Sequence, residues 1–182
     1  MKDAAIWSKG ARWAVCAVAM IVLAGDQVSK SLVLAAHPGP GGRGLVSVRL
    51  VRNTGASFGL GAGHPVVVVL VAVVIIAVVA ALLARTRGKA AALCLAAVLG
   101  GALGNLADRL FRAPGLGRGA VVDWIHVSFY PATFNIADLA IRVGAVGAVI
   151  AMLGIGARGP SWRPRRAPAA DSLAPHDKQA DA

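Results

Sequence analysis

The chain has 182 residues, of which 57% are hydrophobic and 15% charged, and its formal net charge is +11. A soluble domain of this size could not bury so much apolar side chain, so the composition excludes an ordinary soluble protein and indicates a membrane protein. The positive charge would suit nucleic acid or an anionic membrane surface, but the basic residues stand at the ends of apolar runs, so nucleic acid is not expected as a partner.

Four apolar stretches are long enough to cross a lipid bilayer, for which about 20 residues are needed. They predict an all-α membrane protein with four transmembrane helices, at about 13–36, 65–84, 90–107 and 136–157. The first stretch follows basic residues, as the apolar part of a cleavable signal peptide does. Because Asp26 and Lys30 stand where small residues would mark a cleavage site, a retained helix is favoured.

Lys and Arg residues gather before the first helix, between the second and third, and after the fourth. Since positive residues favour the cytoplasmic side, both termini are expected in the cytoplasm and the two longer connections on the outer face. The chain then divides into a cytoplasmic N-terminus at 1–12, a membrane domain at 13–158, and a disordered basic tail at 159–182 that is rich in Pro, Ala and Arg.

The two outward connections differ from plain linkers. Leu45–Arg52 reads L-V-S-V-R-L-V-R, a β-branched and partly alternating run that predicts a short strand. Gly119–Phe134 is too apolar for a solvated loop, and its aromatic residues suit the level of the lipid headgroups.

The chain has eight acidic residues, all of them aspartates, and four lie in the tails. The others stand at the outer ends of predicted helices or in the apolar outer connection, where ionisable groups are costly and are functional candidates. These four are Asp26, Asp108, Asp123 and Asp138.

Ion pairing is the structural alternative for three of the four. Asp26 lies four residues before Lys30, the better order for an ion pair on one helical face. Asp108 adjoins Arg109, with which it could close a helix end, and Arg142 could neutralise Asp138 from one turn away.

Asp123 has no basic residue within four positions and lies among apolar neighbours, which tend to raise the pKa of a carboxyl group. Two such carboxyls brought together share one proton, so that one activates water while the other donates a proton, which is the machinery for hydrolysing a peptide bond. Spacing alone leaves the pair of Asp123 and Asp138 as one of six choices. The histidines lack metal-ligand spacing and no serine lies in a G-x-S-x-G elbow, so no metal or other cofactor is expected.

Five polar blocks stand in order between Arg12 and Gly156: D-Q-V-S-K at Asp26–Lys30, R-N-T-G-A-S-F-G at Arg52–Gly59, G-N-L-A-D-R at Gly104–Arg109, V-V-D-W-I at Val121–Ile125 and F-N-I-A-D at Phe134–Asp138. Together they resemble the lipoprotein signal peptidase family, or signal peptidase II. The resemblance implies a small extracytoplasmic β-sheet cradle that includes Leu45–Arg52, with Gly119–Phe134 as a covering surface segment.

The resemblance also implies the activity, which is cleavage of diacylglyceryl prolipoproteins just before the lipidated cysteine, at the outer face of the bacterial cytoplasmic membrane. Membrane lipids are the other expected partners, and a monomer is expected. By motif position, the catalytic aspartates are Asp123 and Asp138, the substrate-binding residues are Asn53, Asn105, Arg109 and Asn135, and the supporting residues are Asp26, Lys30 and Asp108.

Arg142 departs from the pattern, because a small or apolar residue is expected one turn after the second aspartate. A contact with Asp138 would be awkward for a pair that shares a proton, and the alternative is that Arg142 reaches outward to the headgroups. Two rival functions are a proton-coupled transporter, for which Asp26 lies too near the outer end of its helix, and a membrane assembly factor, which leaves Asp123 without a role.

Overall fold

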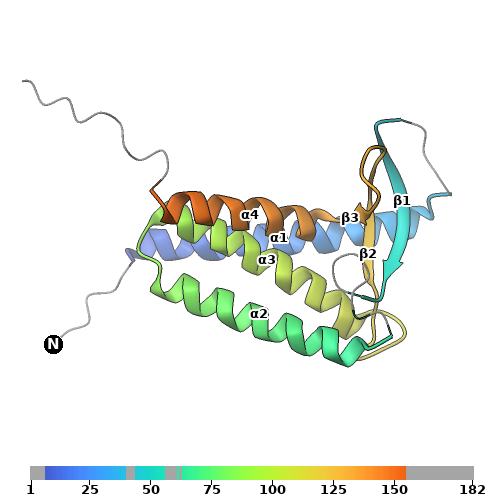
Figure 1. Cartoon of the computed structure of the whole chain (residues 1–182), viewed down its shortest axis with the longest axis horizontal. Helices are drawn as coiled ribbons and strands as arrows, with labels where there is room; N and C mark the ends of the chain where they lie inside the picture. Colours follow the sequence, from blue (N-terminus) through green and yellow to red (C-terminus); the bar gives the residue numbers. More distant parts are fainter. Residues whose placement is uncertain (1–6, 40–43, 56–60, 62, 155–182) are drawn as a thin grey trace, which may run out of the picture.

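The computed structural model describes residues 7–39, 44–55, 61 and 63–154. Four helices lie alongside one another, and a small sheet stands across the end at which α1 finishes and α4 begins (Figure 1). The elements are α1 at Lys9–Ala36, β1 at Val46–Asn53, α2 at Pro65–Arg85, α3 at Lys89–Phe111, β2 at Val121–Val127, β3 at Thr133–Phe134 and α4 at Ile136–Met152.

Three helices, α1, α2 and α3, are long and apolar enough to cross a membrane. Helix α1 begins at Lys9, four residues before the predicted start, because the Ser8 hydroxyl caps it by accepting a hydrogen bond from the Ala11 N–H at 3.2 Å. Helix α3 continues to Phe111, beyond the predicted end at 107.

Helix α4 is shorter than predicted. It has 17 residues and ends at Met152 rather than at 157, because Gly154 takes a left-handed conformation with φ of 66° that stops the helix. The predicted disordered tail at 159–182 lies outside the described residues.

Helix α3 is the centre of the bundle and contacts the other three helices. Eleven of its residues are buried, against two in α1 and two in α2. Glycines permit this close approach, since a Cβ on Gly100 would collide with the backbone of Ala19 in α1, and one on Gly101 would lie 2.6 Å from the carbonyl oxygen of Ala137 in α4. The outer faces of α1, α2 and α4 carry exposed Val, Ile and Leu, as a lipid-facing surface requires.

The sheet is antiparallel in the order β1-β2-β3. The strand predicted at Leu45–Arg52 is present as β1, and its register with β2 pairs Val51 with Asp123 and Asn53 with Val121, after an irregularity between Val48 and Val51. The expected covering segment at Gly119–Phe134 is not a separate element. It supplies β2, which pairs with β1, and β3, which pairs with β2, because its β-branched and aromatic residues suit a sheet.

Candidate functional site

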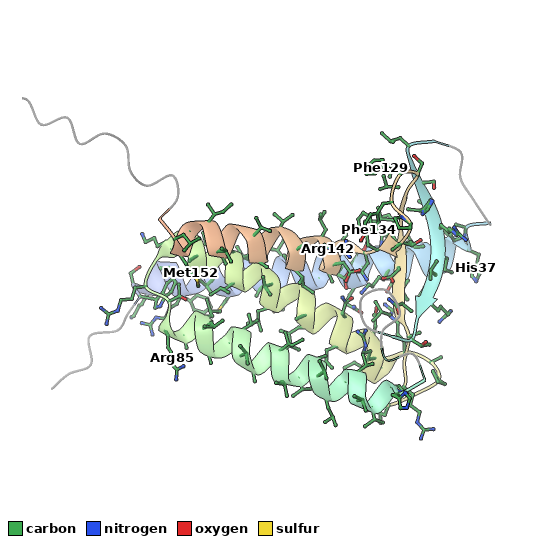
Figure 2. The ribbon with its side chains drawn as sticks, viewed as in Figure 1. His37, Arg85, Phe129, Phe134, Arg142 and Met152 are labelled. Carbon is green, nitrogen blue, oxygen red and sulfur yellow. The ribbon has the colours of Figure 1, made fainter. Side chains whose placement is uncertain are left out.

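A cavity of about 660 Å³ lies between the sheet and the adjoining parts of α2, α3 and α4. One part of its wall is apolar and comes from α2 and α3, with Val68, Val71, Ile75, Val98 and Ala102. The other part is polar, and Figure 2 shows a group of oxygen and nitrogen atoms beside the sheet end of α4. The polar wall includes Asn53, Asn105, Arg109, Asp123 and Asp138.

Asp123 projects into this cavity from the middle of β2 and is only 2% exposed. Its carboxylate accepts hydrogen bonds from the side-chain amides of Asn53 at 3.2 Å and Asn135 at 2.6 Å. The pKa of Asp123 is raised from 3.8 to about 6, first by burial and then by the negative charge of Asp138, while the two amide donors oppose the rise. Asp123 therefore exchanges its proton near neutral pH.

Asp138 reaches the same cavity from the first turn of α4. Its backbone N–H donates to the side-chain oxygen of Asn135 at 2.8 Å, which makes Asn135 the N-cap of the helix. Its carboxylate accepts a hydrogen bond from the Asn105 amide at 2.8 Å. The position of this carboxyl is thus fixed from α3 and from the start of its own helix.

Asn135 connects the two aspartates and is itself fully buried. Its amide nitrogen donates to Asp123 and, at 3.2 Å, to the side-chain oxygen of Asn105, while its oxygen accepts from the backbone of Asp138. A single side chain therefore links β2, α3 and α4 at the place where the carboxyls meet.

Arg109 does not form the ion pair with the adjacent Asp108 that was the structural alternative. Its guanidinium donates to the carbonyl oxygens of Asn105 at 3.1 Å and Gly55 at 2.8 Å. Neighbouring residues on a helix point about 100° apart, so they do not face each other. Arg109 instead turns to the cavity, where it is attracted by both Asp138 and Asp123.

A buried ionic cluster lies behind the polar wall. Lys30 is fully buried and pairs with Asp26 at 2.7 Å, as its spacing predicted, and with Asp108 at 2.8 Å. Asp108 also pairs with Arg112, which sequence reasoning overlooked although it lies one helical turn away. Two carboxylates and two cations leave this cluster without net charge.

The cluster is tied to the site and to the neighbouring backbone. The Lys30 ammonium donates to the Asn105 side-chain oxygen at 2.9 Å, which leaves the Asn105 amide nitrogen to face Asp138. The backbone N–H groups of Val122 and Ala137, each next to a cavity aspartate, donate to Asp108 and Asp26 respectively. Gln27, also overlooked, donates to Gly104 and to Asp108.

Arg142 lies at the edge of the same cavity. Its guanidinium stands over the rings of Tyr130 and Phe134, and no ion pair joins it to Asp138 within the part of the chain that the structure describes. Arg142 therefore contacts the two aromatic rings rather than the carboxylate of Asp138.

The arrangement can carry out acid–base chemistry. Two carboxyls share one cavity, one of them with a pKa near 6, and amide groups hold both. Such a pair can hold one proton between its members, so one carboxylate can take a proton from water while the other gives one to a bound group. Among the described residues, no group of three or more His, Cys, Asp or Glu is placed to hold a metal ion.

The chain is similar to known proteins both in sequence and in fold. A family model described as signal peptidase (SPase) II matches residues 18–154. The chain is 42% identical over 141 residues to a lipoprotein signal peptidase of Rhodococcus jostii, covering 75% of this chain and 70% of the relative. It is 40% identical over 139 residues to a lipoprotein signal peptidase of Mycobacterium tuberculosis, covering 73% of this chain and 67% of the relative.

Two solved structures share the fold, and both are described as bacterial membrane enzymes. One has a TM-score of 0.67 at 22% sequence identity, covering 80% of this chain and 92% of the other. The second has a TM-score of 0.64 at 23% identity, covering 76% and 92%.

Proposed function

The chain belongs to the signal peptidase II family, and from this premise we propose that it is an aspartic endopeptidase that removes the signal peptides of diacylglyceryl-modified prolipoproteins. The observation that carries the proposal is the meeting of Asp123 and Asp138 in one cavity, where Asn135 bonds to both residues. The cut falls just before the lipidated cysteine.

In the proposed reaction the two carboxyls hold one proton. The ionised carboxylate takes a proton from a water molecule, whose oxygen attacks the carbonyl carbon of the scissile peptide bond. The protonated carboxyl gives its proton to the substrate, so that the amide nitrogen leaves as an amine and the aspartates return to sharing one proton. With a pKa of about 6, Asp123 can serve in either protonation state close to neutral pH.

The neighbouring polar residues hold the substrate and the dyad in this proposal. Arg109 donates from two N–H groups to carbonyl oxygens of the protein, and the N–H groups without a partner among the described residues would bind a peptide carbonyl of the substrate. Asn53 and Asn135 orient Asp123, and Asn105 orients Asp138. Asp26, Lys30 and Asp108 support the wall from behind.

The apolar wall of the cavity, from α2 and α3, is where the proposal places the apolar signal peptide and lipid. Helix α4 is proposed to cross the membrane with the other three, in a membrane domain at 13–158 that acts as a monomer. Both termini then lie in the cytoplasm and the cavity opens at the outer face of the bacterial cytoplasmic membrane.

The position of Asp26 argues against the transporter hypothesis, which needs this carboxylate to bind a proton or substrate. Asp26 is fully buried against Lys30 and accepts the Ala137 N–H at 3.0 Å, so it faces neither a pore nor solvent. The assembly-factor hypothesis does not account for a buried carboxyl with a raised pKa at the wall of a cavity.

The experiment that tests the function uses the purified chain in lipid vesicles with a diacylglyceryl precursor and its unlipidated twin, each with and without a chelator. We expect a mobility shift only for the lipidated precursor and no effect of the chelator. Cleavage of both precursors would contradict the assignment of the substrate, and loss of activity in chelator would contradict a reaction driven by two carboxyls.

The dyad is tested by Asp123→Asn and Asp138→Asn, each of which should lower turnover by about 100-fold or more, because each removes a group that moves a proton. Thr133→Val is the matched control, since it alters a cavity-lining residue without removing a carboxyl and should retain turnover. Full activity in either asparagine variant would refute the assignment of the dyad.

A further inference from the structure

Arg142 could contact either the carboxyl of Asp138 or the rings of Tyr130 and Phe134, and in the structure it contacts the rings. It follows Asp138 by one helical turn, and side chains four residues apart on a helix are neighbours. The guanidinium carbon instead lies 5.8 Å from the centre of the Tyr130 ring and 5.7 Å from that of Phe134. Figure 2 shows Arg142 and Phe134 together at the sheet end of α4.

The rings of Tyr130 and Phe134 together form a binding site for the Arg142 cation. Their centres are 6.1 Å apart and their planes meet at 80°, an edge-to-face arrangement. Both rings lie within about 6 Å of the guanidinium, the range over which a ring face attracts a cation. Tyr130 precedes β3 and Phe134 ends it, so the rings belong to the segment that joins β2 to α4.

The position of the Arg142 charge matters because other cations already lie around the dyad. The carboxyl of Asp138 faces Asn105 and Arg109 of α3 and Asp123 of β2, while Lys30 of α1 lies beyond Asn105. Arg49 and Arg52 of β1 line the same cavity. A further cation in direct contact with the pair would favour its ionised form. The pair would then lose the shared proton on which its chemistry depends.

We propose that the rings of Tyr130 and Phe134 hold the Arg142 guanidinium away from Asp138, which makes the two rings positioning residues that protect the dyad from this charge. The inference rests on the proposed peptidase function. It explains how this chain keeps an arginine one turn from a proton-sharing carboxyl, where a small or apolar residue would be expected.

The test is a rescue series on cleavage of the lipidated precursor across pH. Phe134→Leu frees the guanidinium to turn to Asp138, so we expect turnover at pH 7 to fall about threefold to tenfold, with the pH–activity profile moved to lower pH. Adding Arg142→Met in the same chain should restore both rate and profile. Arg142→Met alone should leave both unchanged, because the freed cation is then absent.

Phe129→Leu is the matched control. Phe129 is an aromatic of the same connection, is 79% exposed and has no ring contact with Arg142 among the described residues. It should behave like the wild type. Should Phe134→Leu fail to fold, Tyr130→Leu removes the other ring and is subject to the same rescue.

Equal impairment of Phe134→Leu with and without Arg142→Met would overturn the inference, because the ring would then matter only for packing. An inactive Arg142→Met variant would overturn it as well, since the guanidinium would then act directly. Asp138→Asn separates these outcomes from failure of the proposed function. If that variant cleaves normally the dyad itself is wrong, and if it is inactive only the role of Arg142 is in question.

Discussion

The ionised form of Asp123 destabilises the fold, because its carboxylate is buried and lies near the charge of Asp138. Its pKa of about 6 exceeds the ordinary value of 3.8, mainly through burial and then through the charge of Asp138. The folded chain therefore binds this proton more tightly than the unfolded chain, and the contribution of Asp123 to stability is lost as pH rises from about 4 to 6. A shift of this size lowers the free energy of unfolding by about 3 kcal/mol at pH values above that window.

Asp123→Asn should therefore stabilise the fold while abolishing turnover. We expect the free energy of unfolding at pH 8 to rise by about 1–2 kcal/mol, less than the full shift because an asparagine amide meets one of the two amide donors unfavourably. The gain should disappear near pH 4, where the aspartate is neutral. Thermal unfolding in detergent across pH measures both.

Asp26→Asn is the contrasting control. It replaces a carboxylate that is paired with Lys30, so it should lose stability at neutral pH. A less stable Asp123→Asn variant at pH 8 would show that the burial cost of the aspartate is compensated by contacts with Asn53 and Asn135.

At the residue scale the sequence identified the candidate catalytic aspartates but did not show which of them lie together. Depth in apolar stretches singled out four aspartates, but spacing left six possible pairs, and only the resemblance selected Asp123 and Asp138. The role of Asn135 could not be seen, because it depends on β2, α3 and α4 meeting in space. Arg112 had a visible signal, since it stands one turn after Asp108.

At the scale of elements, the places of the helices could be predicted because a lipid environment demands long apolar runs. Of the four predicted transmembrane helices, α1, α2 and α3 are long and apolar enough to cross a membrane, while α4 as a transmembrane helix stays a prediction. The ends of the helices could not be predicted, because these depend on single residues such as the Ser8 cap and the left-handed Gly154. Strand β1 was visible in its β-branched alternation. Strands β2 and β3 were not, because pairing between distant segments leaves no periodic signal in a run that is apolar throughout.

Lys30 joins these elements, since its ammonium reaches two carboxylates and Asn105 across α1 and α3. Lys30→Met should lower the free energy of unfolding by about 3–5 kcal/mol, because it leaves buried carboxylates short of a cation. Turnover by the fraction that remains folded should fall much less than in the dyad variants. Unfolding in detergent and activity per folded molecule separate the two effects.

Lys89→Met is the matched control, because the same change at an exposed lysine at the start of α3 should alter stability little. A folded Lys30→Met variant with no activity at all would contradict a supporting role and argue for a part in proton transfer.

For the whole molecule, the described polar side chains of the site gather at one end, where the sheet stands across the helices (Figure 1). The proposed topology places this end outside the cell. Single cysteines test it in a chain whose Cys16 and Cys94 are replaced by alanine. An impermeant maleimide should label Ser128→Cys, beside β2, in intact cells, but should label Arg87→Cys, between α2 and α3, only after the membrane is opened.

Both positions are exposed, so access to the reagent depends on the side of the membrane rather than on burial. Labelling of Arg87→Cys in intact cells, with Ser128→Cys protected, would reverse the topology.

Asn135 alone separates β3 from α4, and its side chain donates to the Asp123 carboxylate and accepts from the backbone N–H of Asp138. Because this junction is a single residue, we expect the two carboxyls to keep their spacing if the sheet moves against the bundle. Helix α2 has only Val68 and Val79 buried, so we expect it to be the part of the cavity wall that moves with the smallest loss of packing free energy. We therefore expect a bulky lipid-bearing chain to enter sideways past α2, while the spacing of the aspartates stays the same throughout its passage.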